Sequence, residues 1–353
     1  MALLFIDGFD HYDPQALDSF GEPWLARGKA AYLSPQATRI PGRRPSSYAL
    51  RLPAGPGGGY VKNLPSVRSA LIVGAAVRVA PFSNTGELPV LMGVRDTAAN
   101  MTHAVGIDAD GRLRALQSRN GDWFLTLARS VATAAARGWH YIEMRLVQSD
   151  YSGVFEVRLN GVSVITLYAL NTLNGANGLI TVFLGPPPGQ ETAVTIDVDD
   201  LYIADTTGTI NNTFLGDVRV DVLQAQAQGT QAQWSVLPSG LQAWQAVSDG
   251  DDATAITAST VGMRHSFDMA ALPVMASPAV HGVQVTMLAR KTDAGNGRVR
   301  GLVISGAQSA VSADIVLEEQ LAWHTAMFEL NPNGNVQWTE GTLNAAEFGV
   351  EAA

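Results

Sequence analysis

Three aspartates near the middle of the chain have the types and spacing to do chemistry. Asp197, Asp199 and Asp200 lie within the strand-like run TAVTIDVDDLYIADTTG, residues 192–208. Clustered carboxylate oxygens are the ligands that Ca²⁺ prefers, and a pair of carboxylates can also act as general acid and base on a sugar. Three roles are therefore open: a calcium site, an acid–base pair, or a structural role within a sheet.

The hydrophobic pattern around these aspartates favours the structural role. Apolar residues up to Val198 share one parity along the run, and those from Leu201 onward share the other. The phase therefore slips by one residue at Asp199–Asp200, which predicts a β-bulge at that point. A bulge leaves nearby amides unpaired, and aspartate side chains can accept their hydrogen bonds.

Calcium binding is the alternative that the same residues keep open. Asp197, Asp199 and Asp200 would supply the ligands, and Asp7 and Asp10 could join them if the first and last strands of a sheet are neighbours. The run lacks the regular aspartate spacing and the distal glutamate of an EF-hand loop. A glycosidase pair is less favoured, because no second carboxylate motif across a sugar cleft can be recognised.

Two tryptophans, Trp234 and Trp244, are the candidates for contact with a glycan or with another subunit. They lie in a segment with few alternating hydrophobic residues. Tryptophan stacks on sugar rings and is enriched at protein interfaces, although packing in a core is its commoner role.

Known catalytic motifs are missing from the sequence. It contains no Gly-x-Ser-x-Gly, no Gly-x-x-x-x-Gly-Lys and no His-Glu-x-x-His pattern, and its histidines form no close ligand pair. We therefore predict that the chain is not an enzyme.

Composition excludes several other classes. The net charge is −9 with no basic stripe, which argues against nucleic-acid binding. No apolar stretch approaches the ~20 residues of a membrane span, and no signal peptide is visible at the amino terminus. The chain has no cysteine, which rules out disulfides and fits assembly in a reducing cytoplasm.

The dominant hydrophobic period is two, which predicts β-strands throughout. The clearest element is the run GVFEVRLNGVSVITL, residues 153–167, where two strands should join in a hairpin at Asn160–Gly161. A second hairpin is expected at Asp110–Gly111. Strands at short, regular spacing without intervening helices indicate a β-sandwich or jelly roll.

We expect two domains. The first covers residues 1–205, a small polar linker follows at 206–216, and an all-β second domain covers 217–353. Within the second domain, residues 225–260 are expected to form long loops.

The ordered motifs resemble a known fold and a known class of proteins. The segments LLFIDGFDHY, IDADGRL, GWHYIEMRL, GVFEVRLNGV and IDVDDLYIAD resemble a concanavalin A-like, laminin-G-type jelly roll. With FLGDVRV, ARKTDAG and WTEGTLNAAEFGV following in that order, nearly the whole chain resembles a class of tailed-bacteriophage virion proteins.

This resemblance implies an all-β chain, with a concanavalin A-like jelly-roll sandwich followed by a second β-sandwich domain. It also implies a non-enzymatic tail, tail-fibre or decoration protein of the virion, assembled in the host cytoplasm. The expected partners are other virion proteins and further copies of the chain, for example in a trimer. The alternative is a carbohydrate-binding module that recognises host-surface glycans.

Overall fold

The computed structural model shows an almost entirely β-stranded protein. It describes residues 1–10, 30–83, 88–119, 123–173, 178–186, 190–192, 194–273 and 279–353. The chain divides into two compact units, of which the first extends to Val220 and the second begins at Asp221. Within the described part, no helix has both the length and the apolar character of a membrane span.

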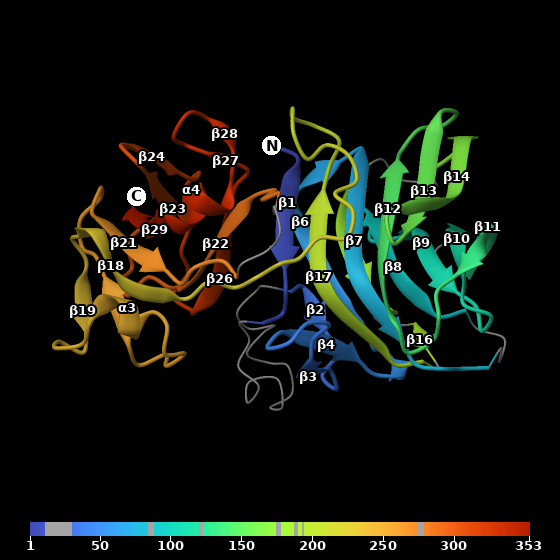
Figure 1. Ribbon diagram of the computed structural model, residues 1–353, viewed down its shortest axis with the longest axis horizontal. Coiled ribbons are helices and arrows are strands. Elements are labelled where there is room, and N and C mark those ends of the chain that lie inside the picture. Colours follow the sequence, from blue (N-terminus) through green and yellow to red (C-terminus); the bar gives the residue numbers. More distant parts are fainter. Residues whose placement is uncertain are drawn as a thin grey trace. The chain divides into compact units, whose positions relative to one another are not determined.

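The first unit is a sandwich of two antiparallel sheets (Figure 1). The first sheet has eight strands, in the spatial order β14 (Val162–Leu170), β13 (Gly153–Leu159), β12 (Trp139–Val147), β7 (Ala70–Val79), β17 (Ile196–Ala204), β4 (Tyr48–Leu52) and β3 (Thr38–Pro41), with β1 (Leu3–Asp7) also paired to β17. The second sheet has seven, in the order β11 (Trp123–Thr133), β10 (Arg112–Arg119), β9 (Met101–Ile107), β8 (Val90–Asp96), β15 (Leu179–Leu184), β6 (Tyr60–Arg68) and β2 (Tyr32–Leu33). A short pair, β5 (Gly55–Pro56) with β16 (Glu191–Thr192), completes the unit.

Alternating apolar side chains from both sheets fill the space between them. The inward residues of β7 and β12, including Val73, Val77 and Met144, pack in one cluster with Val94 and Val182 of the second sheet. Outward positions on the same strands are free to carry polar groups. The fold prediction, a concanavalin A-like jelly roll, is confirmed for this unit.

Both predicted hairpins are present. Leu159 pairs with Val162 across a turn in which Asn160 and Gly161 have positive φ angles of 51° and 79°. The β9–β10 hairpin turns at Gly111, whose φ is 79°. The prediction of both hairpins from residue types that tolerate a positive φ is therefore confirmed.

The second unit is a smaller β-sandwich. Its six-stranded sheet runs β18 (Ala225–Ala232), β21 (Arg264–Met269), β29 (Glu347–Ala352), β23 (Arg298–Ser305) and β24 (Gln308–Val311), with β25 (Ile315–Val316) also paired to β23. A two-stranded ribbon, β22 (Val283–Ala289) and β26 (Ala322–Phe328), packs on it through a shared apolar cluster. Smaller elements are β19 (Ser235–Leu237), β20 (Ala255–Thr257), β27 (Leu330–Asn331), β28 (Val336–Gln337) and the short helices α3 (Ala243–Ala246) and α4 (Glu340–Asn344).

The predicted long loops at 225–260 are only partly correct. Residues 225–232 form β18 at the edge of the six-stranded sheet, and 235–237 pair with 255–257. β18 is an edge strand rich in glutamine and alanine, and most of its side chains are half-buried or exposed. Because it buries few side chains, its sequence shows no alternation of apolar and polar residues. Backbone pairing, rather than burial of large side chains, defines it.

Candidate functional site

The three predicted aspartates lie on the outer face of the first sheet, on β17. Its pairing with β7 shifts register between Asp199 and Tyr202, and Asp200 has a positive φ of 49°. This is the predicted bulge. All three carboxylates point away from the core, yet each residue is at most 4% exposed. Their burial therefore depends on groups that cover the sheet.

Asp197 lies between two arginines from neighbouring strands. Its carboxylate is 2.7 Å from Arg51 Nε on β4 and 2.7 Å from a terminal nitrogen of Arg78 on β7. The register explains the contact, because both arginines stand directly opposite Asp197. Both carboxylate oxygens accept hydrogen bonds from guanidinium groups, so Asp197 is neutralised locally.

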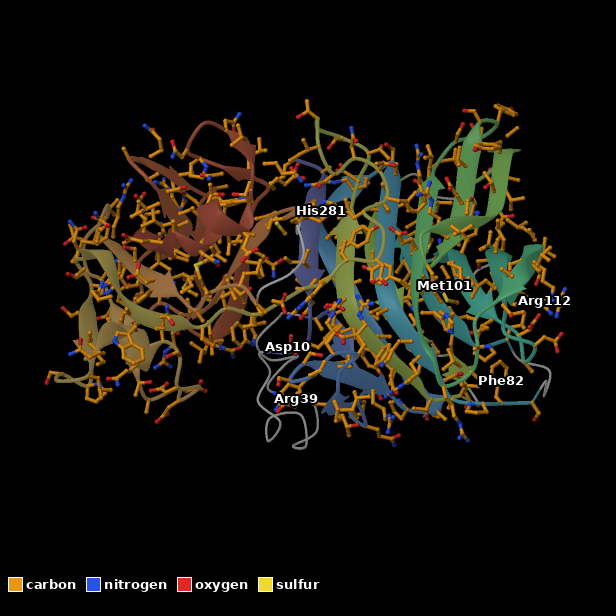
Figure 2. All side chains as sticks on the ribbon, in the orientation of Figure 1. Asp10, Arg39, Phe82, Met101, Arg112 and His281 are labelled. Carbon is orange, nitrogen blue, oxygen red and sulfur yellow. The ribbon has the colours of Figure 1, made fainter. Side chains whose placement is uncertain are left out.

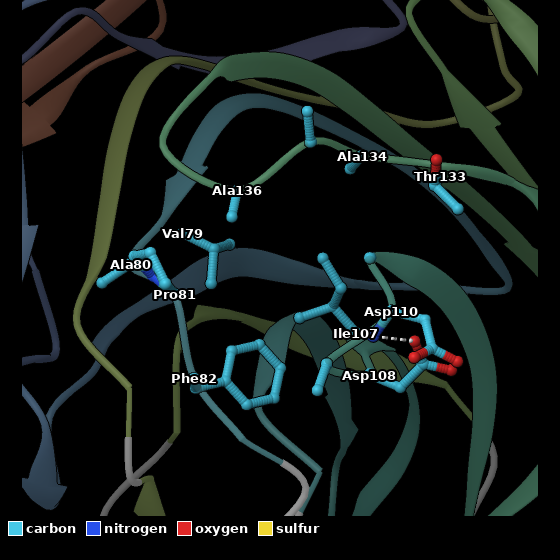
Figure 3. Close-up of a pocket in the computed structure, with 13 residues that line it drawn as sticks. Val79, Ala80, Pro81, Phe82, Ile107, Asp108, Asp110, Thr133, Ala134 and Ala136 are labelled. Carbon is cyan, nitrogen blue, oxygen red and sulfur yellow. Dashed lines mark hydrogen bonds between the residues drawn. The ribbon is translucent and has the colours of Figure 1, made fainter.

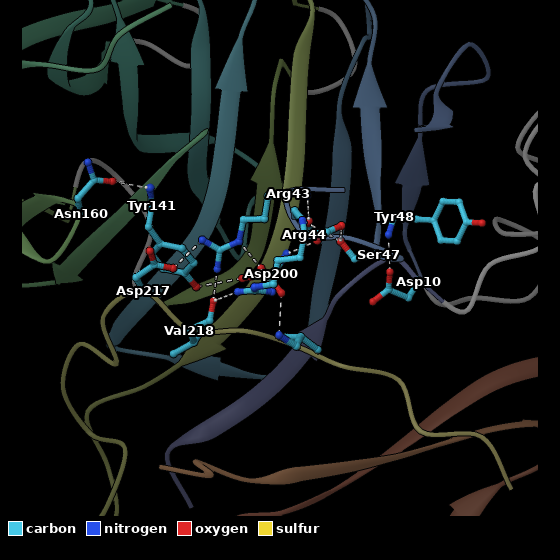
Figure 4. A network of polar contacts seen from close by, with 12 residues as sticks. Asp10, Arg43, Arg44, Ser47, Tyr48, Tyr141, Asn160, Asp200, Asp217 and Val218 are labelled. Carbon is cyan, nitrogen blue, oxygen red and sulfur yellow. Dashed lines mark hydrogen bonds and ion pairs between the residues drawn. The ribbon is translucent and has the colours of Figure 1, made fainter. Parts of the chain in front are cut away.

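Asp200 is the centre of a larger network (Figure 4). One of its oxygens lies 2.5 Å from Arg43 Nε and 2.8 Å from Arg44, and the other accepts the backbone N–H of Val220 at 2.7 Å. Arg43 continues to Asp217 at 2.6 Å. The bulge turns Asp200 outward to meet these partners.

Asp199 is the unusual member of the three. Its carboxylate accepts the backbone N–H groups of Arg43, at 3.1 Å, and of Asp200, at 2.8 Å. No ion pair of Asp199 is seen in the described residues. Burial and the nearby Asp200 charge raise its pKa to about 7. Asp199 therefore carries its charge only partly at neutral pH.

A segment that follows β17 covers this face, and we call residues 214–220 the strap. The N–H of Gly216 donates to Glu143 at 2.9 Å, and that of Leu215 donates to the Tyr202 hydroxyl at 3.2 Å. Tyr202 in turn donates to Glu143 at 2.5 Å. Burial raises the pKa of Glu143. The strap, whose first residues overlap the predicted linker 206–216, is thus fixed to the first sheet by hydrogen bonds.

Gly74 makes room for this arrangement. A Cβ built on it would lie 2.2 Å from the Tyr202 ring. The ring passes directly over β7 and brings its hydroxyl to Glu143 on β12. A side chain at position 74 would displace the ring and break the contact with the strap.

Metal binding at the aspartates stays a prediction. Across the described ranges, no group of three or more acidic or histidine residues has the arrangement to hold a metal ion. The predicted neighbourhood of the first and last strands is present, because β1 pairs with β17. Asp7 and Asp10, however, accept the backbone N–H groups of Phe9 and Tyr48.

Trp234 and Trp244 lie apart in different clusters of the second unit. Trp234 packs half-buried against the main core, and its indole donates to the Met263 carbonyl at 3.0 Å. Trp244, on α3, packs half-buried against a small cluster that includes Phe267. A glycan or interface role for either tryptophan stays a prediction.

A pocket of about 150 Å³ opens at one end of the first unit (Figure 3). It lies where the end of β7, the β9–β10 turn and the end of β11 meet. Its lining is Val79, Ala80, Pro81, Phe82, Ile107, Asp108, Ala109, Asp110, Gly111, Thr133, Ala134, Ala135 and Ala136. The small side chains of 134–136 create the space, and the Phe82 ring supplies the one aromatic surface.

Two carboxylates give this pocket its charge. Asp108 is fully buried and accepts the backbone N–H groups of Asp110 and Arg112, while Arg129 lies 2.5 Å from its other oxygen. These contacts lower the pKa of Asp108 despite its burial. Asp110 pairs with the same Arg129 at 2.7 Å, but its side chain is 63% exposed. Asp110 can therefore accept hydrogen bonds from a ligand.

In the sequence, the IDADGRL segment indicated a hairpin and formed part of the resemblance to a jelly roll, but it was not predicted to contribute to a site. The segment does place two carboxylates beside a turn, and that signal was available. The contribution of Phe82 and of the alanines at 134–136 could not be read locally, because they reach the pocket from other strands.

No family model and no curated protein matches the chain. Among solved structures, it is similar to an endo-β-1,4-glucuronan lyase from the fungus Trichoderma reesei, with 15% identity over 48% of this chain and 87% of that one, at a TM-score of 0.33. The cellulose induced protein Cip1 shows 16% identity over 60% and 99% of the two chains, at a TM-score of 0.40.

The carbohydrate-binding module CBM66 from Bacillus subtilis is also similar, with 13% identity over 48% of this chain and 95% of the module, at a TM-score of 0.32. Such distant likenesses assign no ligand and no reaction to this chain.

One prediction from the sequence needs correction. The chain was expected not to be an enzyme because no catalytic motif was found. The similar structures include enzymes, namely the glucuronan lyase and sialidases of Trypanosoma rangeli. The missing motif was therefore weak evidence, and the expectation is withdrawn.

Proposed function

We propose that the chain binds carbohydrate, and that the pocket beside Phe82 receives a sugar residue. The observation that supports this is the combination of one aromatic ring, an apolar floor and an exposed carboxylate in a single small pocket. A sugar ring presents an apolar C–H face that can pack on an aromatic side chain, and its hydroxyl groups donate to carboxylates. Binding sites typically pair an apolar lining with a few such polar groups.

The geometry assigns a role to each residue. Phe82 would pack on the sugar face, while the exposed oxygen atoms of Asp110 would accept hydroxyl protons. Asp108 is already saturated by backbone N–H groups and Arg129, so it would hold the turn in place rather than contact the sugar.

Titration calorimetry and NMR shift mapping against a panel of oligosaccharides test this proposal. Phe82→Ala and Asp110→Asn should each weaken binding about tenfold or more, which corresponds to ~1.4 kcal/mol. Tyr151→Ala is the matched control, because Tyr151 is an 84% exposed aromatic residue outside the pocket lining. If no sugar shifts the resonances of residues 79–82, 107–111 and 133–136, the proposal fails.

We further propose that this binding serves a bacteriophage particle, as a tail, tail-fibre or decoration component that recognises host-surface glycan. The support is the ordered set of sequence segments, of which FLGDVRV forms the strap and WTEGTLNAAEFGV forms α4 with β29. Mass spectrometry of purified particles tests this location, and a protein missing from them would contradict it. We also propose that the chain self-associates, for example as a trimer. Light scattering of the purified chain tests this, and a monomer at all concentrations would contradict it.

A further inference from the structure

Arg95, on the outer face of the second sheet, is half-buried and has no ion pair among the described residues. Arg95 lies on β8, where Met92 and Val94 point into the core. Side chains alternate between the two faces of a strand, so Arg95, which follows Val94, points outward. The pairing of β8 with β9 shifts register between Val94 and Arg95. The Nε atom of Arg95 is shielded from solvent and has no hydrogen-bond partner in the described residues.

Eight other arginines of the first unit have a carboxylate within 4 Å, namely Arg43, Arg44, Arg51, Arg68, Arg78, Arg114, Arg129 and Arg158. Two further half-buried arginines, Arg112 and Arg145, have no such pair in the described residues, and each has a shielded Nε atom without a partner, as Arg95 has. Arg95 shows no such pair in the part of the chain that the structure describes. Burial lowers the pKa of Arg95, and no carboxylate there acts against this shift.

The adjacent residue Asp96 does not neutralise Arg95. Its carboxylate turns into its own loop, where it accepts the backbone N–H groups of Ala98 and Asn100, each at 2.9 Å, and the Asn100 amide. Asp96 is fully buried. The half-buried guanidinium therefore has an unused capacity for an anion.

The strands beside β8 place a second hydrogen-bond donor, the side-chain amide of Asn63, in line with Arg95 across the sheet. Thr181 on β15 stands opposite both Arg95 on β8 and Asn63 on β6. The Thr181 hydroxyl donates to the Asn63 side-chain carbonyl at 2.8 Å. This hydrogen bond leaves the exposed Asn63 amide NH₂ to donate outward. On the other side of Arg95 the register places Met101, labelled in Figure 2, whose apolar side chain is buried.

The spacing of the two donors limits the ligand. Two strand intervals separate Arg95 from Asn63, which is about 10 Å between their backbones. A guanidinium binds a carboxylate with two parallel hydrogen bonds, whereas an amide NH₂ suits a neutral hydroxyl or ring oxygen. A molecule with a carboxylate and several hydroxyl groups a few ångströms apart satisfies both.

We infer that Arg95 and Asn63 form a second saccharide site, which takes an acidic sugar by binding its carboxylate to Arg95 and a neutral oxygen to Asn63. The inference rests on the proposed carbohydrate-binding function and extends it to uronic acids. It uses residues outside the pocket beside Phe82, so the two sites can be tested separately.

Trigalacturonic acid and the galactose trisaccharide of the same linkage are the probes, because they differ only at the carboxylate. Arg95→Gln should weaken binding of the acidic trisaccharide at least tenfold and leave binding of the neutral one unchanged. Arg95→Lys keeps the charge but loses the two-pronged geometry, so it should weaken binding less. Arg137→Gln, at an exposed arginine, is the control for a general loss of positive charge.

Several outcomes overturn the inference. Equal affinity of the native protein for the two trisaccharides would do so, as would an equal loss in Arg137→Gln and Arg95→Gln. Acetate that binds as tightly as trigalacturonic acid would mean a simple carboxylate site rather than a sugar site. If neutral sugars do not bind but acidic ones bind through Arg95, the pocket proposal fails while the acidic site stands.

Discussion

On the outer face of the first sheet, Asp197 and Asp200 each lie between two arginines, whereas on the outer face of the second sheet Arg95 has no carboxylate partner among the described residues. The two faces belong to the same sandwich and share the same alternation. The strap lies on the first face and brings backbone N–H groups to Asp200, Glu143 and Tyr202.

This difference separates a structural role from a binding role. A buried charge is tolerated when partners neutralise it and satisfy its hydrogen bonds. Asp197 and Asp200 of the first face meet that condition with arginines of the chain itself, and the Asp200 network also holds the strap. Arg95 is only half-buried, and its shielded Nε atom has no partner in the described residues, so an anionic ligand would supply a contact that the described chain does not.

Removing the Asp200 carboxylate should destabilise the protein most. Asp200→Ala leaves Arg43 and Arg44 without their buried partner and removes the acceptor for Val220 N–H. Breaking one side of a buried pair costs about 3–5 kcal/mol. Thermal and urea unfolding of the purified chain measures this loss.

Asp217→Ala is the matched control, because Asp217 binds the same Arg43 but its side chain is 55% exposed. We expect a loss of about 0–1 kcal/mol, as for exposed ion pairs. Equal losses in the two variants would mean that the network around Asp200 does not stabilise the fold more than a surface pair does.

Tyr202→Phe should have an intermediate effect. It removes a hydroxyl that donates to Glu143 and accepts from Leu215 N–H, while the ring over Gly74 is kept. Loss of such a hydrogen bond costs about 1–3 kcal/mol when the partners stay buried. Hydrogen exchange should become faster at Leu215 and Gly216 but not in the β9–β10 hairpin. Unchanged exchange in the strap would contradict its attachment through Tyr202.

Asp199 should make stability depend on pH near neutrality. Its pKa in the folded protein is raised from 3.8 to about 7, so the folded state binds a proton that the unfolded state releases. The resulting stabilisation is fully present below about pH 3.8 and is lost as the pH rises through about 7. Urea unfolding at intervals from pH 4 to pH 8 should show this decline, and Asp199→Asn should reduce it. An identical pH profile in the variant would contradict the shift.

Sequence periodicity predicted the local features of the site well. The change of hydrophobic phase at Asp199–Asp200 located the bulge, and glycine after asparagine or aspartate located both hairpins. These features depend on residues next to one another in the chain. From the sequence, a structural role for the aspartates was favoured because of the same change of hydrophobic phase.

The partners of the aspartates could not be predicted in this way. Arg43 is 157 positions from Asp200, and Gly216 is 73 positions from Glu143. Only the order of strands in the sheet brings them together, and a single sequence does not fix that order. The same reason explains why Arg95 was overlooked. An arginine on a strand is ordinary in sequence, and only the arrangement of β6, β15 and β8 shows that it lacks a partner and stands in a row with Asn63.

Replacing Arg95 should change stability least, and in the opposite sense to the replacement of a paired arginine. Arg95→Met keeps an unbranched side chain of similar reach and removes a half-buried cation that has no ion pair in the described structure. Without ligand, stability should stay within about 0.5 kcal/mol or rise, as at sites without a specific interaction. Arg43→Met should instead lower it, because Asp200 would keep only Arg44 as its cationic partner. Parallel urea unfolding of the two variants measures the contrast directly. A clear loss of stability in Arg95→Met would mean that the guanidinium already stabilises the free protein, and it would remove the reason to expect an anionic ligand on that face.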